Sequence, residues 1–335
     1  MTVSKQQESF KTKGKPIGTL SIAPMMDWTD KHCRVFHRLL SPNALLYTEM
    51  ITTGALKHGD KERFLSFNEI EQPLALQLGG SNPADMATCA ELAEHAGFKE
   101  VNINVGCPSD RVQNGRFGAC LMSEPALVAE CVSAMLEKVS IPITIKTRTG
   151  IDDFDSQAFL VDFVGKTAEV GCRTFIIHAR KAILKGLSPK ENRTIPELNY
   201  DRAYTVKKEF PDLTVIVNGG VKTVGDIERH WQHVDGVMIG REAYHNPFFL
   251  AEAEHHLFSQ PLVDRVEVLN NYLPYVESEL SKGVSLQSIS RHLLGLFAGQ
   301  PMGKHWRRYL SENARFKHSG TEVLLAALEQ MKPYQ

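Results

Sequence analysis

The chain has 335 residues, of which 42% are hydrophobic and 23% charged, and its formal net charge at pH 7 is −1. This composition is ordinary for a globular protein, and the length suits one large domain followed by a smaller one. The near-zero charge excludes binding of nucleic acid over the whole surface, so any RNA contact must depend on a local basic patch.

Residues 1–15 are polar and have no apolar centre, so we expect a flexible tail rather than a secretory signal. From residue 19 onward, short apolar runs recur at intervals. They predict eight strands, at 19–24, 45–49, 74–78, 101–105, 141–146, 174–178, 213–217 and 236–239. Most of these runs are continuously apolar, which is typical of strands covered on both faces in a parallel sheet.

Helical patterns lie between the strands. They predict helices at 83–96, 124–139, 156–170 and 223–232. The first of these follows Asn82-Pro83 and ends before Gly97, as helices commonly begin and end. Alternating strands and helices favour a (β/α)8 TIM barrel, with a doubly wound open sheet as the second choice. The barrel is preferred because residues of chemical interest follow almost every strand, and the loops at these strand ends build the active sites of such barrels.

Strand signals stop near residue 250. The rest of the chain predicts four helices, at 264–281, 285–298, 301–315 and 320–331, which together suggest a small helical bundle. We therefore expect a tail at 1–15, a catalytic barrel at 16–250 and a helical domain at 251–335. No apolar run is long enough to span a bilayer, so we expect a cytoplasmic protein, and we expect it to be a monomer.

The six cysteines include no C-x-x-C pair, and we expect neither a disulfide framework nor a metal site. Cys107 stands apart, because it follows the fourth predicted strand between Gly106 and Pro108. Loops at this end of a barrel carry its chemistry, so we interpret Cys107 as functional. Cys33, Cys89, Cys131 and Cys172 are interpreted as buried residues, which is the commoner situation for a free cysteine, and Cys120 is interpreted as structural.

Several further strand ends carry residues suited to binding a ligand. Lys146 and His178 each end a strand, where a cation and a hydrogen-bond donor would meet an anion or an electron-rich ring. The next two strands are followed by glycines and a cation, which suit the phosphate site of this type of barrel. These residues are Asn218, Gly219, Gly220, Gly240 and Arg241.

Two more positions suit a flat ring with polar edges. Met25 and Met26, after Pro24 and the first strand, are placed to pack against an aromatic surface, although a simple core role is the alternative. Gln77, in the third strand, offers a donor and an acceptor. The pattern as a whole indicates a phosphorylated, flat cofactor, and FMN fits this description.

At this point the sequence resembles the tRNA-dihydrouridine synthases, from about residue 20 to residue 250. The segments that carry the resemblance are APMMDWTD, LYTEM, LQLGG, NINVGCPSDRVQNGRFGACLM, KTRTG, IIHARKA, VNGGV and GVMIGREAYHNP. The segments LSPKENR and WRRYLSEN resemble the A subfamily in particular. NVGCPS is the most specific motif, because related flavin barrels do not have Cys-Pro at this place.

The resemblance implies a reaction and a set of roles. FMN, reduced by NADPH, would deliver hydride to C6 of a uracil that has left its stack, and Cys107 would protonate C5. The target would be uridine 20 of the tRNA D-loop and its neighbour 20a. The FMN-binding residues would be Pro24, Met25, Met26, Gln77, Lys146, His178, Asn218, Gly219, Gly220, Gly240 and Arg241.

Residues 301–320 are rich in cations, with Trp306 and Tyr309 among them, and this mixture favours an RNA patch over a plain solvated helix face. Lys304 and Arg307 are three residues apart and so share one helix face. By resemblance, the tRNA-reading residues would be Asn104, Lys190, Arg193, Lys304 and Arg307.

Two other functions remain open from the sequence. A different FMN barrel, such as a dihydroorotate dehydrogenase or an ene-reductase, would share the flavin loops but act on a small molecule. A tRNA-binding or chaperone-like protein would need the basic patch but not Cys107. The sequence also leaves open whether NADPH or NADH reduces the flavin, because no separate dinucleotide motif is present.

Overall fold

The computed structural model describes residues 19–109 and 115–331. By compactness these residues group into two units: a barrel unit, formed by the described residues of 16–26 and 45–240, and a helical unit, formed by 27–44 and the described residues of 241–335. The expected tail at 1–15 lies outside the described residues. The expected domain boundary at residue 250 stays a prediction.

Eight parallel strands form the barrel, which confirms the predicted fold. They are β1 (Leu20–Ile22), β2 (Leu46–Thr52), β3 (Leu74–Gly79), β4 (Glu100–Val105), β5 (Ile143–Arg148), β6 (Thr174–His178), β7 (Thr214–Asn218) and β8 (Gly236–Ile239). Their order is β1-β8-β7-β6-β5-β4-β3-β2, and Leu45 closes the ring by exchanging backbone hydrogen bonds with β1. This sequential order and closure exclude the doubly wound open sheet.

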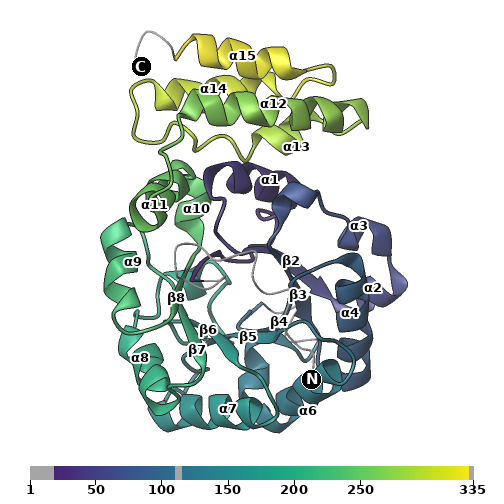
Figure 1. Cartoon of the computed structure of the whole chain (residues 1–335), viewed down its shortest axis with the longest axis vertical. Helices are drawn as coiled ribbons and strands as arrows, with labels where there is room; N and C mark the ends of the chain where they lie inside the picture. The colour runs from purple at the N-terminus through teal and green to yellow at the C-terminus, as the bar shows by residue number, and fades with distance from the viewer. Residues whose placement is uncertain (1–18, 110–114, 332–335) are drawn as a thin grey trace, which may run out of the picture. The chain divides into compact units, whose positions relative to one another are not determined.

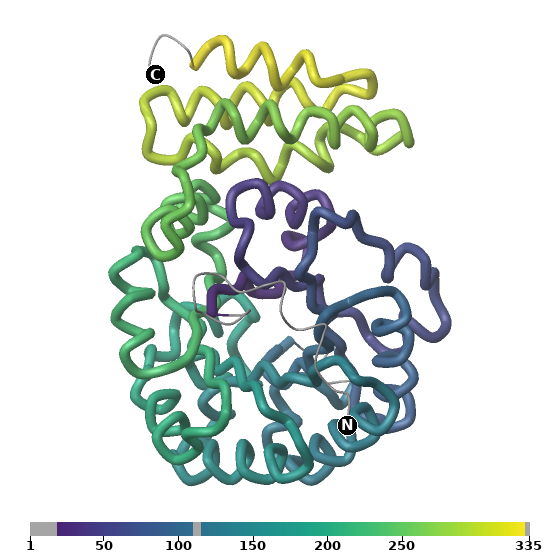
Figure 2. The backbone as a smooth tube through the Cα atoms, viewed as in Figure 1, coloured from purple at the N-terminus to yellow at the C-terminus, as the bar shows by residue number. Residues whose placement is uncertain are grey.

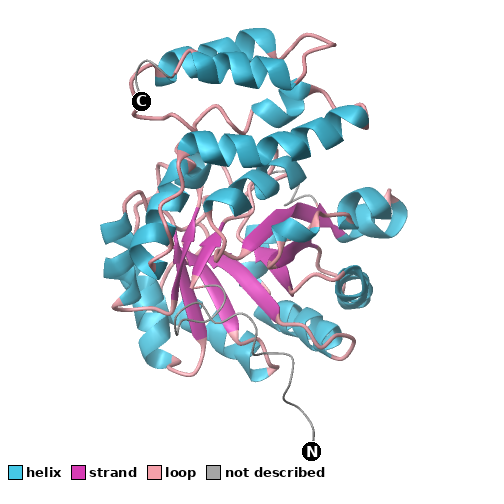
Figure 3. Cartoon of the chain, turned by 45° about the horizontal axis from the view of Figure 1, so that its top comes forward, coloured by secondary structure: helices cyan, strands magenta, loops and turns pink. Residues whose placement is uncertain are grey.

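Helices surround the strands of the barrel unit, and the chain passes from strand to strand around the ring in sequence order (Figures 1 and 2). Colouring by secondary structure shows the strands inside and the helices outside (Figure 3). The helices of this unit are α2 (Thr53–His58), α3 (Lys61–Leu65), η1 (Glu69–Glu71), α4 (Pro83–Ala96), η2 (Gly118–Ser123), α6 (Pro125–Leu136), α7 (Gln157–Glu169), η3 (Glu191–Arg193), α8 (Tyr200–Glu209) and α9 (Val224–Trp231).

Local signals explain why α4 has the predicted bounds. The side chain of Asn82 accepts a hydrogen bond from the backbone of Asp85, and Pro83 occupies the first turn. At the other end Gly97 adopts a left-handed conformation with φ 96°, which costs glycine little. Between these ends α4 buries Met86, Ala90 and other apolar side chains. The helix is therefore specified by its own sequence.

The barrel interior contains an apolar cluster, to which most of the strands contribute, and polar side chains beside it. Its core cluster consists of Ala23, Leu45, Tyr47, Ala75, Ile176, Ile216 and Met238, all buried. Inward-facing side chains alternate with outward-facing ones along each strand, so every second residue points into the ring. Beside this cluster, Asn102 and Thr144 are buried in the interior and joined by a hydrogen bond.

The helical unit contains α1 (Lys31–Leu40), α10 (Arg241–His245), α11 (Phe248–Phe258), α12 (Arg265–Ser281), α13 (Leu286–Ser290), α14 (Gly303–Asn313) and α15 (Thr321–Glu329). The sequence patterns did not predict α1, α10 and α11. The helix predicted at 285–298 was wrong in extent, because α13 ends at Ser290. A series of turns follows, each closed by a backbone hydrogen bond between residues three positions apart. Its predicted apolar stripe is nevertheless buried, including Ile289, Leu293 and Leu296.

Candidate functional site

The carboxyl ends of the strands bring five predicted side chains together at one end of the barrel. The parallel register places Asn104 beside Lys146, and His178 beside Asn218. Gln77, on the strand next to Asn104, accepts a hydrogen bond from it, with 2.9 Å between Nδ2 and Oε1. The five residues form an arc over β3 to β7, at the end where barrels of this kind hold their active sites.

Cys107 lies two residues beyond the end of β4 and is half-buried. Its backbone N–H donates to Asn104 Oδ1 at 2.9 Å, and its carbonyl accepts from the N–H of Ala119 at 2.9 Å. Its thiol donates to Ser109 Oγ at 3.6 Å. The loop is thus fixed on both sides of a thiol that remains partly accessible, as a group that transfers a proton requires.

The remaining cysteines have other surroundings. Four are buried: Cys33, Cys89, Cys131 and Cys172. Burial raises the pKa of the Cys172 thiol to about 12 and that of Cys89 to about 11. Cys120 is half-buried and donates to the carbonyl of Phe117 at 3.2 Å, and burial raises its pKa too. A raised pKa makes a thiol a weaker acid, so Cys89, Cys120 and Cys172 are poor proton donors at neutral pH.

Lys146 is a cation held in poorly solvated surroundings. Desolvation and the positive charge of Arg148 lower the pKa of its ammonium group to about 7, while the charge of Cys107 opposes the shift. Among the described residues, only Asn218 accepts a hydrogen bond from Lys146, with 3.2 Å between Nζ and Oδ1. An ammonium group has three donors. The remaining donors can therefore serve an acceptor on a bound ligand.

Arg148, in the segment KTRTG, also lies near Cys107, although the sequence did not predict it as a site residue. Its guanidinium is buried and donates to three backbone carbonyls, at 2.9 Å to Gly106, 3.2 Å to Lys181 and 2.8 Å to Asn192. It therefore ties the loop of Cys107 to the loop that follows β6. Burial lowers its pKa to about 10, while the charge of Cys107 opposes this shift. Along a strand every second side chain points to the same side, so Arg148 lies on the same side as Lys146. This spacing could have predicted that Arg148 belongs to the site.

The glycines after β7 lie too close to neighbouring side chains for either position to carry a Cβ. Gly219 and Gly220 have φ of 111° and 73°, which favours glycine at both positions. A Cβ on Gly219 would lie 2.7 Å from the ring of His178, and one on Gly220 would lie 2.6 Å from the hydroxyl of Tyr200. Tyr200 also donates to the carbonyl of Gly219 at 2.9 Å. The turn is thus closely packed and held by Tyr200, and its glycine backbone suits the binding of a phosphate group.

The loop after β1 contributes apolar surface. Pro24 and Met25 are half-buried, and Met25 packs against the barrel's core cluster. Met26 is 54% exposed, which is unusual for so large an apolar side chain. After β8 the chain continues through Gly240 into Arg241, the first residue of α10, and both are half-buried. The alternative role as a core residue therefore applies to Met25 in part, and it does not apply to Met26.

The loop after β6 carries two of the predicted tRNA residues. Lys190 and Arg193, at the ends of a single turn of 3-10 helix, are both exposed. Between them the buried side chain of Asn192 donates to the carbonyls of Ile183 and Leu187, and it accepts from the backbone N–H of Ile183 at 2.7 Å. One buried amide thus determines the shape of the loop that displays the two cations.

In the helical unit, α14 carries two more of the predicted tRNA-binding residues. Lys304 and Arg307 are exposed, as the shared helix face predicted. Trp306 is the exception to the predicted basic and aromatic patch: it is completely buried and donates from its indole to the carbonyl of Leu293 at 2.9 Å. The apolar face of α14 requires a core residue at this position, so Trp306 is unable to stack on RNA. The aromatic part of that prediction was wrong for Trp306.

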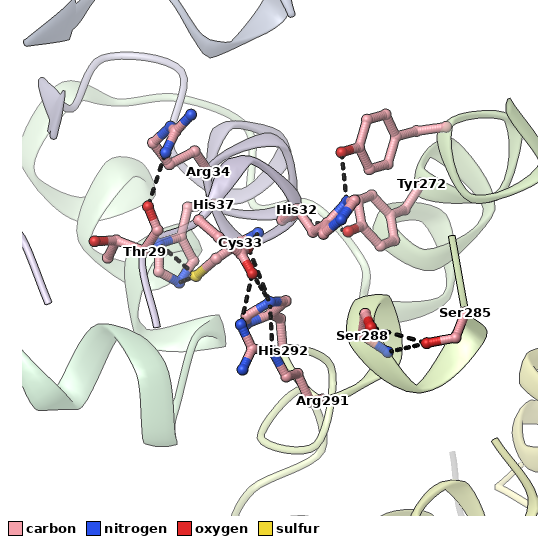
Figure 4. Close-up of polar contacts among 12 residues, drawn as sticks. Thr29, His32, Cys33, Arg34, His37, Tyr272, Ser285, Ser288, Arg291 and His292 are labelled. Atoms are coloured by element: carbon pink, nitrogen blue, oxygen red, sulfur yellow. Dashed lines mark hydrogen bonds and ion pairs between the residues drawn. The ribbon is translucent and has the colours of Figure 1, made fainter. Parts of the chain in front are cut away.

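A second polar cluster, within the helical unit, surrounds the start of α1 (Figure 4). Asp30 accepts a hydrogen bond from the backbone of Cys33, and it pairs with Arg291 at 2.6 Å and with His292 at 3.0 Å. Tyr272 donates to the carbonyl of His32 at 2.8 Å. These contacts attach α1 to α12 and to the turns after α13. They explain why α1 groups with the C-terminal helices.

Within 19–109 and 115–331, no helix combines the length and apolarity that a bilayer crossing requires. In the same ranges no three His, Cys, Asp or Glu side chains converge as metal ligands do.

Comparison with known proteins identifies relatives over nearly the whole chain. The family described as "Dihydrouridine synthase (Dus)" matches residues 21–332. A protein of Vibrio cholerae named tRNA-dihydrouridine(20/20a) synthase is 59% identical over 319 residues, covering 94% of this chain and 97% of the relative. A protein of Escherichia coli K12 with the same name is 58% identical over 315 residues, covering 93% and 91%.

Among solved structures, a 2-naphthoyl-CoA reductase in complex with 2-naphthoyl-CoA matches with a TM-score of 0.55 at 11% identity. The match covers 76% of this chain and 53% of that one, so this chain spans about half the length of the reductase. At this level of identity the likeness concerns the fold alone.

Proposed function

The chain belongs to the dihydrouridine synthase family, and on that premise we propose that it reduces the C5–C6 double bond of uridines 20 and 20a in the tRNA D-loop, giving 5,6-dihydrouridine. The observation that carries the proposal is the placement of Cys107, held by Asn104 on the loop after β4 beside the charges of Lys146 and Arg148. Relatives that bear this activity in their names are more than half identical to the chain.

The residues at the barrel mouth fit FMN as the cofactor. The turn at Gly219 and Gly220, both with positive φ and followed in the chain by Gly240 and Arg241, suits a phosphate group. Pro24, Met25 and Met26 offer apolar surface to a flat ring, and Gln77, Lys146, His178 and Asn218 offer polar groups to its edge. When bound, FMN that has been reduced by NADPH would supply the hydride that saturates the double bond.

Cys107 supplies the proton. Its thiol donates a proton to C5 while C6 receives the hydride, and the sulfur remains as a thiolate. The cationic groups of Lys146 and Arg148 stabilise that negative charge, since each interacts electrostatically with Cys107. Solvent then reprotonates the partly accessible sulfur and returns the site to its starting state.

The tRNA contacts divide between the two units. We assign Lys190 and Arg193 of the β6 loop, and Lys304 and Arg307 of α14, to phosphates of the tRNA backbone, because all four cations are exposed. Phosphate contacts orient the RNA without reading its sequence. Asn104 belongs with the reacting base, since it lies between Gln77 and Cys107 at the barrel mouth.

The test is a direct assay of the reaction. The purified protein is loaded with FMN and incubated with NADPH and an unmodified tRNA transcript, and mass spectrometry maps any uridine that gains two hydrogens. We expect modification at positions 20 and 20a, loss of turnover in Cys107→Ala, and retained turnover in the matched variant Cys120→Ala. A yellow protein inert toward every tRNA would instead indicate a small-molecule substrate, and failure to bind FMN would refute the cofactor assignment.

A further inference from the structure

A series of hydrogen bonds, buried in its lower part and partly buried near the mouth, runs along the inside of the barrel from the amino end of β4 to the loop of Cys107. We call it the interior polar chain. Its side chains come from three neighbouring strands, β3, β4 and β5. Its members are Glu100, Thr144, Asn102, Gln77 and Asn104.

The lower part of the interior polar chain joins β4 to β5. Thr144 Oγ1 donates to Glu100 Oε1 at 2.6 Å, and Asn102 Nδ2 donates to Thr144 Oγ1 at 2.8 Å. These three residues are buried, with exposed fractions of 8% for Glu100, 1% for Thr144 and 0% for Asn102. They are therefore out of reach of a ligand at the barrel mouth, and any effect they have on the reaction is indirect.

The upper part reaches the mouth. Gln77 Nε2 donates to Asn102 Oδ1 at 2.8 Å, and Asn104 Nδ2 donates to Gln77 Oε1 at 2.9 Å. The remaining amide oxygen of Asn104 accepts from the backbone N–H of Cys107 at 2.9 Å and from that of Gly106 at 3.1 Å. From Cys107 down to Glu100, each group donates to the next in one direction.

The lower end of the interior polar chain sets that direction. Glu100 Oε1 accepts from Thr144 and also from the hydroxyl of Tyr47 at 2.8 Å, so this oxygen acts only as an acceptor. Burial raises the pKa of Glu100. A proton on the other carboxyl oxygen would leave Oε1 an acceptor, so the direction holds in both protonation states. Hydrogen bonds aligned in one direction polarise and strengthen one another.

We infer that Glu100, Thr144 and Asn102 are positioning residues that fix the amide orientations of Gln77 and Asn104 and, through Asn104, the backbone of Cys107. An amide without this constraint can turn over and exchange its donor for its acceptor. A turned Asn104 would present its NH2 group to the N–H groups of Gly106 and Cys107 and release the loop. The consequence for uridine reduction rests on the proposed function; the constraint on the loop does not.

Thr144→Val is the variant that tests the inference, because valine keeps the shape of threonine and removes the hydroxyl in the middle of the interior polar chain. Thr167→Val is the matched control: Thr167 is also fully buried, and its hydroxyl donates only to carbonyls of its own helix α7. Thr144→Ser restores a hydroxyl. The measurement is the rate at which iodoacetamide alkylates Cys107 in cofactor-free protein, resolved by peptide mass spectrometry, with Cys120 as the internal reference.

We expect Thr144→Val to alkylate at Cys107 about five times faster than wild type, the factor that corresponds to losing one neutral hydrogen bond. Thr144→Ser and Thr167→Val should match wild type, and the Cys120 rate should stay constant in all variants. The interior polar chain has no positioning role if folded Thr144→Val alkylates at the rate of Thr167→Val.

A single buried substitution can prevent folding, because Asn102 would lose its acceptor. The double variant Asn102→Leu and Thr144→Val removes both partners of that hydrogen bond, and it moves the unsatisfied amide from Asn102 to Gln77, at the upper part of the interior polar chain. It interrupts the same chain below Gln77, so we expect the same faster alkylation, and an unchanged rate would overturn the inference. Because alkylation requires neither FMN, NADPH nor tRNA, its outcome is independent of the assay for uridine reduction.

Discussion

At the scale of single residues, Lys146 shows how the site destabilises a charge that a ligand can stabilise. Desolvation and the neighbouring Arg148 lower its pKa to about 7, from an ordinary value near 10.5. Between these two pH values the unfolded chain binds a proton that the folded, cofactor-free protein does not. The free energy of unfolding therefore falls as pH decreases from about 10.5 to 7, and the penalty is complete below pH 7.

Lys146→Met should remove this penalty. We expect the cofactor-free variant to have a higher Tm than wild type at pH 7, with the difference shrinking as pH approaches 10. Thermal unfolding in a pH series measures this, with Lys138→Met on the exposed surface as the control. Parallel pH curves for wild type and Lys146→Met would contradict the assignment of a depressed pKa to Lys146.

Asp30 is the opposite case, a carboxylate whose charge the fold stabilises. Burial alone would raise its pKa, but hydrogen bonding to His292 and the charge of His292, with help from the Cys33 N–H and Arg291, hold it far below its usual value of 3.8. The resulting stabilisation is fully present above pH 4 and is lost as pH falls further, because the unfolded chain takes up a proton first.

Asp30→Asn tests that interaction while it retains an oxygen to cap α1. We expect it to lower the free energy of unfolding by about 1.5–3 kcal/mol at pH 7, the range for hydrogen bonds to charged groups. Urea unfolding at pH 7 and at pH 3 should show a smaller difference between variant and wild type at the lower pH. An equal difference at both pH values would mean that the charge of Asp30 is not what stabilises the structure.

At the scale of elements, the sequence predicted those whose signals are local. The strands β6 and β8 and the helix α4 lie where the patterns placed them, because their apolar runs and the residues at their ends specify them. The prediction of one continuous helix over residues 285–298 was wrong for a non-local reason. The indole of Trp306 donates to the carbonyl of Leu293, which a continuous helix would pair with the N–H of Phe297.

The candidate site was predictable to a similar depth. Lys146, His178 and Gly219 could be predicted as site residues because each lies at or near the carboxyl end of a strand, and these ends meet at the barrel mouth. The role of Arg148 and the alignment of the interior polar chain depend on which side chains meet across neighbouring strands. Which side chains meet depends on the register between neighbouring strands, and this register cannot be read from the sequence of a single strand.

The loop after β6 gives an element-scale prediction about Asn192. Asn192→Ala removes the buried amide that organises residues 183–194, so we expect faster proteolysis within this loop and weaker tRNA binding. The loss of affinity should approach that of the double variant Lys190→Ala and Arg193→Ala, while FMN affinity stays unchanged. Asn82→Ala, which removes the cap of α4, is the control. Normal tRNA affinity in Asn192→Ala would mean that the loop's shape does not matter for binding.

At the scale of the whole molecule, the closed barrel and the helical unit solve different problems. The barrel gathers strand ends around one mouth, so that a cofactor and a thiol are held by rigid backbone. The net charge of −1 means that attraction to tRNA has to come from local cations rather than from the protein as a whole. Recognition of RNA should therefore be separable from the reduction chemistry.

Salt dependence tests this separation. Each phosphate contact contributes about 0.7–0.9 to the slope of log K against log salt concentration, because binding releases condensed counterions. If Lys304 and Arg307 each contact a phosphate, the double variant Lys304→Ala and Arg307→Ala should lower that slope by about 1.4–1.8. At saturating tRNA its kcat should match wild type, since neither residue belongs to the barrel mouth. Lys208→Ala, an exposed lysine on α8, should leave both slope and kcat unchanged. A reduced kcat with an unchanged slope would assign α14 to the chemistry instead of to the tRNA backbone.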